Sequence, residues 1–445
     1  MSGAAGRVLF LNPSLYAIGG MQAWLAALMP DLGALGWEVG LALPAGRFND
    51  VDAYLAQYPY EPCVRVENPT GTRLGRLLAV ERALRRLRPD VLIVANIAAA
   101  YPAIRRMRAR GAWAPKVAAC VHTLDPGIFA DLERFAGVLD GLVAPNRLIA
   151  AAGIELAGLA PERVWYAPYR VDVPGAPPPP PADAGPLELA FVHRLDQRQK
   201  RALDLPPLVA ALRRRGLDFH LRIVGFGEEE ERLRVELAAE EAAGRVIWIG
   251  AVAPAELRAR ALGPERALLV LSRWEMGPIV AWQAMAWGSP VVSARYVGSG
   301  LEGVLRDGEN ALLFDVGDVE GAATAIARLA ADRELRARLA AAAWRDVGDR
   351  FSQRVATAAW DAALRAIVAA PPLGRPPAPA PIPPAGRLDR WFGVMTAERV
   401  RRVICRPIRA SGPGDEWPHA ESRGLSPREL MARLAALDGV KLPAD

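Results

Sequence analysis

The chain has 445 residues, of which 52% are hydrophobic and 23% charged, and this is the composition of a globular protein with more than one domain. Its three cysteines, Cys63, Cys120 and Cys405, are odd in number and far apart, which excludes a disulfide framework and favours a reducing compartment. The apolar runs are too short for a signal peptide or a membrane span, so we expect a cytoplasmic protein.

The first 173 residues alternate short apolar runs with helical patterns. The expected strands lie at 7–13, 38–44, 90–96, 116–122, 141–146 and 163–168. Leucines at helical spacing from residue 25 to 35 predict a helix, which Pro30 should kink or shorten. Such alternation is typical of a parallel sheet covered by helices on both faces.

A proline-rich stretch at 174–186 breaks this pattern and predicts a linker between domains. A second alternating run follows, with expected strands at 187–193, 219–225, 245–250, 267–272, 290–294 and 311–315 and a last helix at 351–368. A second proline-rich linker at 369–386 precedes a tail at 387–445, which contains a helix start at Ser426. We expect an α/β fold of two parallel-sheet domains, with ligands at the carboxyl ends of the strands and between the halves.

Two pairs of glycines stand directly before expected helices. Gly19 and Gly20 can let the backbone approach a ligand and leave helix N–H groups pointing at it, but a tight strand–helix turn explains them equally well. Gly225 and Gly227 lack the third glycine of a dinucleotide fingerprint, and the acidic run from Glu228 would repel a pyrophosphate. We interpret the second pair as structural.

Polar side chains follow two expected strands of the second half. Arg194 and Lys200 suit a diphosphate, although a solvated basic loop would give the same pattern. Glu275 lies in the loop before a helix that starts near Gly277, and Gln283 lies in the second turn of that helix. Because helical side chains tilt toward the helix N-terminus, Glu275 and Gln283 can both bond hydroxyls of a sugar or ribose. The alternative is an acid that compensates the helix dipole and an amide bonded to the backbone.

The order of these segments resembles the retaining family 4 glycosyltransferases of GT-B fold. The segments that carry the resemblance are the Gly19-Gly20 loop, HRLDQRQK, LRIVGFG, RVIWIGAV, SRWEMGPIVAWQAMAWGSPVV and GSGLEGVLRDGENALLFDVGD. The resemblance covers most of residues 7–368 and is strongest at 191–318. It implies two Rossmann-like domains facing across a cleft, with the acceptor domain at 1–173 and the donor domain for a nucleotide sugar at 187–368.

The resemblance also implies roles for individual residues. Arg194 and Lys200 would bind the donor diphosphate, and Glu275 and Gln283 would bind the donor sugar and ribose, with Gln283 standing where the family has a second Glu. Glu302 occupies the acidic position after the last glycines, and His122 matches a position that faces the cleft, although a buried histidine at a strand end explains it equally well. The predicted site has Glu275 and His122 as catalytic residues and Gly19, Gly20, Arg194, Lys200, Gly277, Gln283, Gly298 and Gly300 as donor-binding residues.

Several positions depart from the family pattern. His193 replaces a Gly before Arg194, Tyr169 and Arg170 change the PNGVD loop, and Asn146 replaces a Ser. These changes, together with Gln283, favour the alternative of a non-catalytic or weakly active paralogue that binds sugar nucleotides. An epimerase of the same fold would need a carboxylate base in the first half, and the sequence does not identify one.

The implied reaction transfers a sugar from a nucleotide sugar with retention at the anomeric carbon, and the leaving diphosphate takes the acceptor's proton. The acceptor would be a glycan, a lipid-linked molecule or a small molecule, in the assembly of a surface polysaccharide or glycolipid. We expect no cofactor and no metal, since the family does not need one and the cysteines and histidines show no metal-ligand spacing.

Arginines cluster at 73–88, at 105–110 and in the tail at 399–409. Basic amphipathic helices of this kind can lie on an anionic membrane, and a solvated helix face is the alternative. We expect no nucleic-acid binding, because no aromatic interleaving or known module accompanies the charge. The linker predicts that the tail is free of both domains; the contrary possibility is that Trp391 and Phe392 pack on the first domain.

Overall fold

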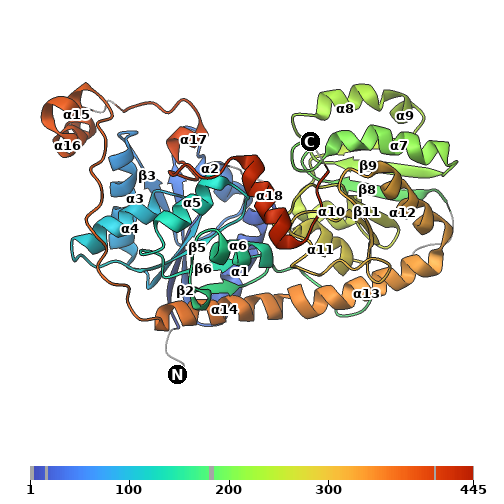
Figure 1. The fold of residues 1–445 in the computed structure, drawn as a ribbon, viewed down its shortest axis with the longest axis horizontal. Coiled ribbons are helices and arrows are strands. Elements are labelled where there is room, and N and C mark those ends of the chain that lie inside the picture. The colour runs from blue at the N-terminus through green and yellow to red at the C-terminus, as the bar shows by residue number, and fades with distance from the viewer. Residues whose placement is uncertain (1–4, 16–18, 180–184, 405–406, 444–445) are drawn as a thin grey trace. The chain divides into compact units, whose positions relative to one another are not determined.

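The computed structural model describes residues 5–15, 19–179, 185–404 and 407–443 (Figure 1). Cys405 lies outside these residues. The chain forms two compact units. Unit 1 comprises Met1–Pro145, Ile149–Ala167 and Thr357–Leu430, and unit 2 comprises Asn146–Leu148, Pro168–Ala356 and Met431–Asp445. After a short excursion at Asn146–Leu148, the chain enters unit 2 at Pro168, shortly before the proline-rich stretch at 174–186.

Unit 1 is built on a seven-stranded parallel sheet with the strand order β3-β2-β1-β4-β5-β6-β7. Six of its strands lie where the sequence predicts them. The seventh, β3, was not predicted, because only Val66 of its five residues is buried and the strand lies at the edge of the sheet. The strands are β1 (Gly6–Leu11), β2 (Trp37–Ala45), β3 (Cys63–Glu67), β4 (Val91–Ala95), β5 (Lys116–Cys120), β6 (Gly141–Ala144) and β7 (Val164–Tyr166).

Helices follow most of these strands. They are α1 (Gly20–Ala34), α2 (Val51–Gln57), α3 (Arg73–Leu87), α4 (Ala100–Ala109), α5 (Pro126–Arg134) and α6 (Arg147–Glu155). The prediction that Pro30 shortens the first helix is wrong, since α1 continues through it to Ala34. Pro30 lies on the exposed side of the helix, where water can satisfy the carbonyl group that loses its intrahelical partner.

Unit 2 contains a six-stranded parallel sheet with the strand order β10-β9-β8-β11-β12-β13, and all six strands lie where the sequence predicts them. In each sheet the first strand, β1 or β8, lies in the interior: the next two strands of the sequence lie on one side of it and the later strands on the other. This order confirms the predicted pair of Rossmann-like domains. The strands are β8 (Leu187–Val192), β9 (Phe219–Val224), β10 (Val246–Gly250), β11 (Arg266–Val270), β12 (Val291–Ala294) and β13 (Leu312–Phe314).

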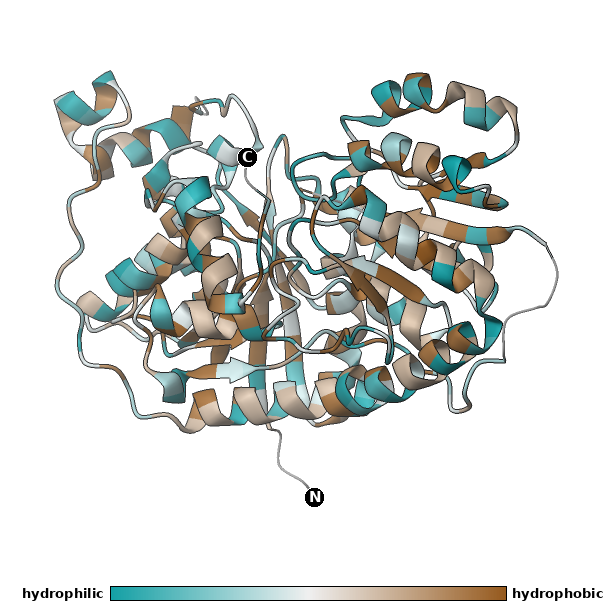
Figure 2. Ribbon diagram, turned by 45° about the vertical axis from the view of Figure 1, so that its right-hand side comes forward, coloured by the Kyte–Doolittle hydropathy of each residue, from teal (hydrophilic) through white to brown (hydrophobic). Residues whose placement is uncertain are grey.

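The helices of unit 2 pack their apolar sides on this sheet, whose strands carry mostly hydrophobic residues (Figure 2). They are α7 (Leu205–Arg214), α8 (Glu230–Glu236), α9 (Ala238–Ala242), α10 (Leu257–Arg260), α11 (Ile279–Ala286), α12 (Val319–Ala331) and α13 (Arg333–Phe351). In such sheets all carboxyl ends meet at one edge, so the loops after β8, β11 and β12 are neighbours there.

The residues after α14 (Gln353–Ala369) do not form a free tail, and that prediction is wrong. They include α15 (Arg387–Phe392), α16 (Val394–Ile404), α17 (Pro413–Glu416) and α18 (Pro427–Asp438). In unit 1, α16 packs against α3, the Glu416 carboxylate accepts N–H bonds from Arg47 at 2.6 Å and Phe48 at 2.9 Å, and Trp417 is buried. Trp391 and Phe392 do not pack on unit 1 either: they are 72% and 57% exposed.

Candidate functional site

The loop after β8 is held in place by the glycines that the sequence analysis interpreted as structural. A Cβ atom on Gly225 would lie 2.0 Å from the His193 carbonyl oxygen, and one on Gly227 would lie 2.3 Å from that of Leu195. Only glycine therefore allows the β9–α8 turn to pack against this loop. The contact fixes the backbone on both sides of Arg194, and it confirms a structural role for the two glycines.

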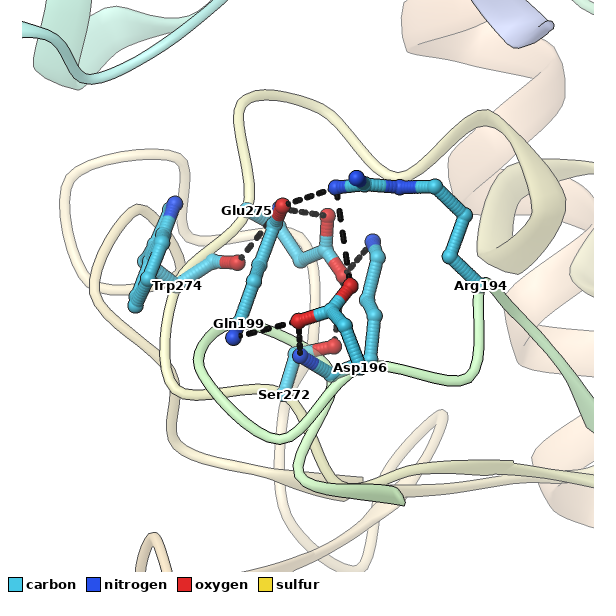
Figure 3. Close-up of polar contacts among 7 residues, drawn as sticks. Arg194, Asp196, Gln199, Ser272, Trp274 and Glu275 are labelled. Carbon is cyan, nitrogen blue, oxygen red and sulfur yellow. Dashed lines mark hydrogen bonds and ion pairs between the residues drawn. The ribbon is translucent and has the colours of Figure 1, made fainter. Parts of the chain in front are cut away.

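Glu275 lies at the centre of a group of polar side chains at the carboxyl ends of β8 and β11 (Figure 3). Its Oε1 accepts hydrogen bonds from Lys200 Nζ at 2.5 Å and from Ser272 Oγ at 2.6 Å. Gln199 Nε2 lies 3.5 Å from Oε2 and donates to the Trp274 carbonyl at 3.2 Å. Glu275 is 4% exposed, so its charge is buried and paired.

Arg194 lies at the edge of this group. Its guanidinium donates to Gln199 Oε1 at 2.7 Å and lies 3.6 Å from Asp196 Oδ2, while its side chain keeps 64% of its surface exposed. Asp196 in turn accepts the N–H of Gln199 at 2.7 Å and that of Lys200 at 3.2 Å, which holds the loop in a tight turn. The structure thus brings Arg194, Lys200 and Glu275 together as predicted. We call these residues with Ser272, Asp196 and Gln199 the Glu275 cluster.

His193 stands beside the cluster, where the resembled family has glycine. Its ring contacts Phe191 edge-on at 5.0 Å and is buried. Burial first, and then the positive charge of Lys200, lower the pKa of His193 well below its ordinary range. The imidazole is therefore neutral at physiological pH and adds no positive charge to the cluster.

The helix α11 begins where the sequence predicts it. Gly277 has a φ of 89°, in the region that favours glycine, and Pro278 precedes the first helical residue. Gln283 lies in the second turn and is half-buried, between the fully buried Trp282 and Ala284. The structure gives no contact between Gln283 and the Glu275 cluster, so a shared role for them stays a prediction.

The loop after β12 presents backbone N–H groups of Gly298, Gly300 and Leu301, which we call the amide cradle. All three point at the carboxylate of Asp438, at distances of 2.6, 3.0 and 2.8 Å. The cradle adjoins the Glu275 cluster, because a Cβ atom on Gly298 would lie 2.1 Å from the Glu275 carbonyl oxygen. Convergent N–H groups of this kind form a concave site for an anion.

Two further residues fix the cradle from within unit 2. Asn146 Nδ2 donates to the Gly298 carbonyl at 3.2 Å, so the amide that replaces the family's serine has a structural contact. The Glu302 carboxylate accepts the N–H of Arg147 at 2.9 Å and is buried. Sequence reasoning missed Ser272, Asp196, Gln199 and Asp438. Only the first three lie in segments that resemble the family.

In unit 1, Gly19 precedes α1 and Gly20 is its first residue. The backbone of Gly19 is extended, and a Cβ atom there would meet Gln22 Oε1 at 2.4 Å, at the end of a side chain that can rotate away. His122 follows β5, and its ring lies 5.3 Å from that of Trp24. Burial lowers the pKa of His122 to about 3. The catalytic role of His122 and the donor contacts of the two glycines stay predictions.

A cavity of about 640 Å³ in unit 1 lies at the carboxyl ends of β2 and β3 and is lined in part by the tail. Its lining includes Arg47, Arg409 and Glu416, and none of the predicted site residues. Among the residues that the structure describes, no helix is both long and apolar enough to cross a membrane.

Comparison with protein families gives two matches that follow one another along the chain. Residues 18–175 match the family described as Glycosyltransferase Family 4, and residues 176–346 match Glycosyl transferases group 1. All the predicted site residues lie within these two ranges. Asp438 and the helices after α13 lie outside them.

The chain is also similar to two curated bacterial proteins. It is 33% identical over 141 residues to the lipopolysaccharide core biosynthesis glycosyltransferase LpsE of Rhizobium meliloti, covering 32% of this chain and 40% of that protein. It is 31% identical over 147 residues to the lipopolysaccharide 1,6-galactosyltransferase of Salmonella typhimurium, covering 32% and 39%. The similarity thus spans about two fifths of the length of these relatives.

Among solved structures, Anabaena Alr3699/HepE in complex with UDP and glucose has the same fold. The TM-score is 0.64 at 20% sequence identity, and the match covers 81% of this chain and 99% of that one. At this identity the likeness shows the fold alone. The predicted GT-B fold, with its two Rossmann-like domains, is confirmed.

Proposed function

We propose that this chain is a retaining glycosyltransferase, which moves a sugar from a nucleoside diphosphate sugar to a glycan, lipid-linked or small-molecule acceptor in the assembly of a surface polysaccharide or glycolipid. The observation that carries the proposal is the Glu275 cluster beside the amide cradle. Two cations, a buried carboxylate and three convergent N–H groups meet there at the carboxyl ends of neighbouring strands. The lipopolysaccharide glycosyltransferases named above support the same reaction class.

In this proposal, Arg194 and Lys200 neutralise the charge that builds up on the departing diphosphate. Lys200 is bonded to Glu275 in the structure, so the donor would share this ammonium with the carboxylate. Glu275 is fixed by Ser272 and Lys200 and still has its Oε2 atom available to accept from sugar hydroxyls, apart from the long contact with Gln199. The cluster thus combines charge for the phosphates with a positioned acceptor for the sugar.

The chemical step breaks the bond between the anomeric carbon and the diphosphate oxygen and forms one from the same face to the acceptor oxygen. The acceptor's proton goes to the leaving diphosphate, so no second carboxylate is needed as a base. Retention is part of the proposal and is checked by the anomeric configuration of the product in NMR spectra. We also propose that the reaction needs no metal, because Arg194 and Lys200 supply the positive charge; full activity in EDTA is the expected result.

Calorimetric titration with UDP, GDP and ADP tests this assignment. We expect one of them to bind, and Arg194→Ala and Lys200→Met each to weaken its binding. A charge-assisted hydrogen bond contributes about 1.5–3 kcal/mol, which corresponds to roughly 10- to 150-fold in affinity. Arg198→Ala is the matched control, because Arg198 is an exposed cation of the same loop. If Arg194→Ala and Lys200→Met bind the nucleoside diphosphate as tightly as the wild type and the control do, the assignment is contradicted.

A second measurement, the release of nucleoside diphosphate from a nucleotide sugar, separates catalysis from binding alone. A non-catalytic paralogue, the alternative that Gln283 and His193 favour, would bind a nucleoside diphosphate and its sugar but release no diphosphate from the sugar. Release of diphosphate that is at least tenfold slower in the Glu275→Gln variant supports the enzyme. Binding without release, at every donor tested, supports the paralogue instead.

The proposal includes peripheral contact with an anionic membrane, for which α15 and α16 of unit 1 form the surface. Their inward side is polar: the buried Glu398 accepts from Thr70 and Thr72 at 2.6 Å each, and the buried Arg401 pairs with Asp389. Their outward side is apolar and cationic. Its exposed apolar residues are Trp391, Phe392, Met395, Val403 and Ile404, and its exposed arginines are Arg387, Arg390, Arg399 and Arg402.

This hairpin reverses the usual arrangement, in which apolar side chains face the protein and charges face water. Between residues 387 and 404 both acidic side chains, Asp389 and Glu398, are buried, so the exposed charges there are all positive. Aromatic and aliphatic side chains among arginines match the interface of an anionic bilayer. By contrast, Arg73, Arg106 and Arg108, in the clusters of α3 and α4, form ion pairs within unit 1.

Flotation with lipid vesicles tests this surface. We expect the chain to bind vesicles that contain phosphatidylglycerol, to bind less at high salt, and to lose binding when Trp391 and Phe392 are both changed to Ser. Phe226→Ser is the control, because Phe226 of unit 2 is as exposed as Phe392, at 56% and 57%. Equal binding to neutral phosphatidylcholine vesicles contradicts the proposal. A wild-type dimer that becomes a monomer in the double variant also contradicts it, since the surface would then bind a second copy of the chain.

A further inference from the structure

The amide cradle is filled by the protein's own C-terminal segment. Asp438 is the last residue of α18, and its carboxylate, 5% exposed, bonds all three N–H groups of the cradle. A Cβ atom on Gly300 would lie 2.0 Å from the Asp438 carbonyl oxygen, so the segment is seated directly on the loop backbone. We call residues 438–443 the C-terminal strap.

The strap is attached at both of its ends within unit 2. At its start, Gly439 has a φ of 68°, and the N–H of Val440 returns to the Ala435 carbonyl at 2.9 Å, which ends the helix. Farther on, Leu442 packs against the apolar core of the unit. The strap lies outside residues 18–346, to which the family matches extend. The structure thus places an added segment on a loop of the matched part.

A carboxylate in this position competes with any other anion. Both oxygens of Asp438 are engaged, so the cradle has no N–H group left for a phosphate while the strap is seated. The pKa of Tyr296 is raised well above its usual range, first by burial and then by the negative charge of three carboxylates, Glu275, Glu302 and Asp438. A bound diphosphate would add two negative charges to those of the three carboxylates. Release of Asp438 would remove one of these charges and so reduce the repulsion.

Two features of the strap favour its release from the cradle. Burial raises the pKa of Asp438, which means that the ionised carboxylate loses hydration in the cradle and regains it when released. Among the strap residues that the structure describes, Leu442 is the one that packs against the apolar core, and it is only partly buried. Release therefore removes one partly buried leucine from the core of unit 2.

We propose that the C-terminal strap is autoinhibitory: Asp438 occupies the amide cradle when no donor is bound, and the donor's diphosphate must displace it. The inference rests on the proposed function, since it assigns the cradle to a phosphate of the donor. If the strap is seated nine-tenths of the time, the apparent donor affinity of the intact chain is reduced about tenfold.

Calorimetric titration of the intact chain with the nucleoside diphosphate that binds tests the proposal. We expect Asp438→Ala to bind about tenfold tighter than the wild type, and Asp438→Asn, which keeps the shape but not the charge, to lie between them. Asp349→Ala removes an exposed acid from α13 of the same unit and should leave the affinity unchanged. Hydrogen exchange of residues 438–443 gives a second readout, because saturating diphosphate should increase it in the wild type.

The outcomes distinguish the two proposals. If neither the wild type nor the Asp438 variants bind any nucleoside diphosphate, the proposed function fails. If the wild type and Asp438→Ala bind equally well, or the variant binds more weakly, the cradle is not blocked by the strap and the inference is overturned while the proposed function stands. Unchanged exchange of the strap at saturating diphosphate overturns it as well.

Discussion

At the scale of single residues, Gln283 is the departure from the family pattern with the clearest chemical consequence. An amide keeps one acceptor and adds two donors, but it lacks the charge that strengthens a hydrogen bond to a hydroxyl. We expect Gln283→Glu to tighten donor binding by severalfold, since hydrogen bonds to charged groups exceed neutral ones by about 1 kcal/mol. The KM for the donor measures this. A weaker donor affinity in the variant would show that Gln283 does not stand where the family's second Glu does.

His122 predicts a pH dependence of folding stability. Its pKa is about 3 in the folded chain and near 6.5 when unfolded, so unfolding binds a proton between these values. Above pH 6.5 both states hold His122 neutral, and this residue costs no stability. As the pH drops from 6.5 toward 3, the free energy of unfolding falls by at most about 1.4 kcal/mol per pH unit. Urea unfolding of unit 1 at pH 7 and pH 5 checks this: His122→Phe should be less sensitive to pH than the wild type, and equal sensitivity would refute it.

The sequence allowed prediction of which residues lie together where they belong to short contiguous motifs. Lys200 and Glu275 are 75 residues apart in the sequence, and Arg194 is farther still from Glu275, yet parallel strands with their carboxyl ends at one edge bring the three together. Ser272 could have been included, because it directly follows the buried strand that leads to Glu275. Asp438 could not: one aspartate at the end of a helix carries no signal of the loop that it contacts 138 residues away.

At the scale of secondary-structure elements, the hairpin of α15 and α16 depends on buried polar contacts with unit 1. Glu398→Ala removes the charged acceptor of the Thr70 and Thr72 hydroxyls, which then rely on the longer contacts with Asn68 at 3.1 Å and with each other at 3.2 Å. We expect a loss of about 1.5–3 kcal/mol, the contribution of a hydrogen bond to a charged group, seen as a melting temperature lower by several degrees. Thr396→Ala, at an exposed position of the same helix, is the control. An unchanged melting temperature for Glu398→Ala would show that the hairpin is not held by these contacts.

The elements themselves were predictable to different degrees. Buried strands such as β4 and β11 are continuous apolar runs and were located from the sequence. The short edge strand β3 (Cys63–Glu67) alternates Val64 and Val66 with Arg65 and Glu67, and was missed. The packing of α16 was missed for another reason: the pattern of the helix is apolar on the outside, and its inward contacts pair residues 326 and 328 positions apart.

At the scale of the whole molecule, the tail is part of the folded protein. Truncation at Pro371 would remove Trp417 and the Glu416 and Glu421 contacts from unit 1. We therefore expect it to lower the melting temperature of unit 1 by several degrees, because a buried tryptophan and its contacts contribute several kcal/mol. The double change of Trp391 and Phe392 to Ser should leave the melting temperature unchanged, since both are exposed. The reverse pattern in a thermal melt would contradict the packing described here.

The most direct test of the proposed function is release of nucleoside diphosphate from a panel of UDP-, GDP- and ADP-sugars, measured for the intact chain and for Glu275→Gln. We predict that at least one donor is cleaved, and that Glu275→Gln lowers the rate at least tenfold while changing the affinity for the free diphosphate much less, because the proposed function places Glu275 at the sugar rather than at the phosphates. Thermal melts of both proteins show that the variant is folded. No cleavage of any donor, or cleavage by Glu275→Gln at the wild-type rate, would contradict a glycosyltransferase that acts through this cluster.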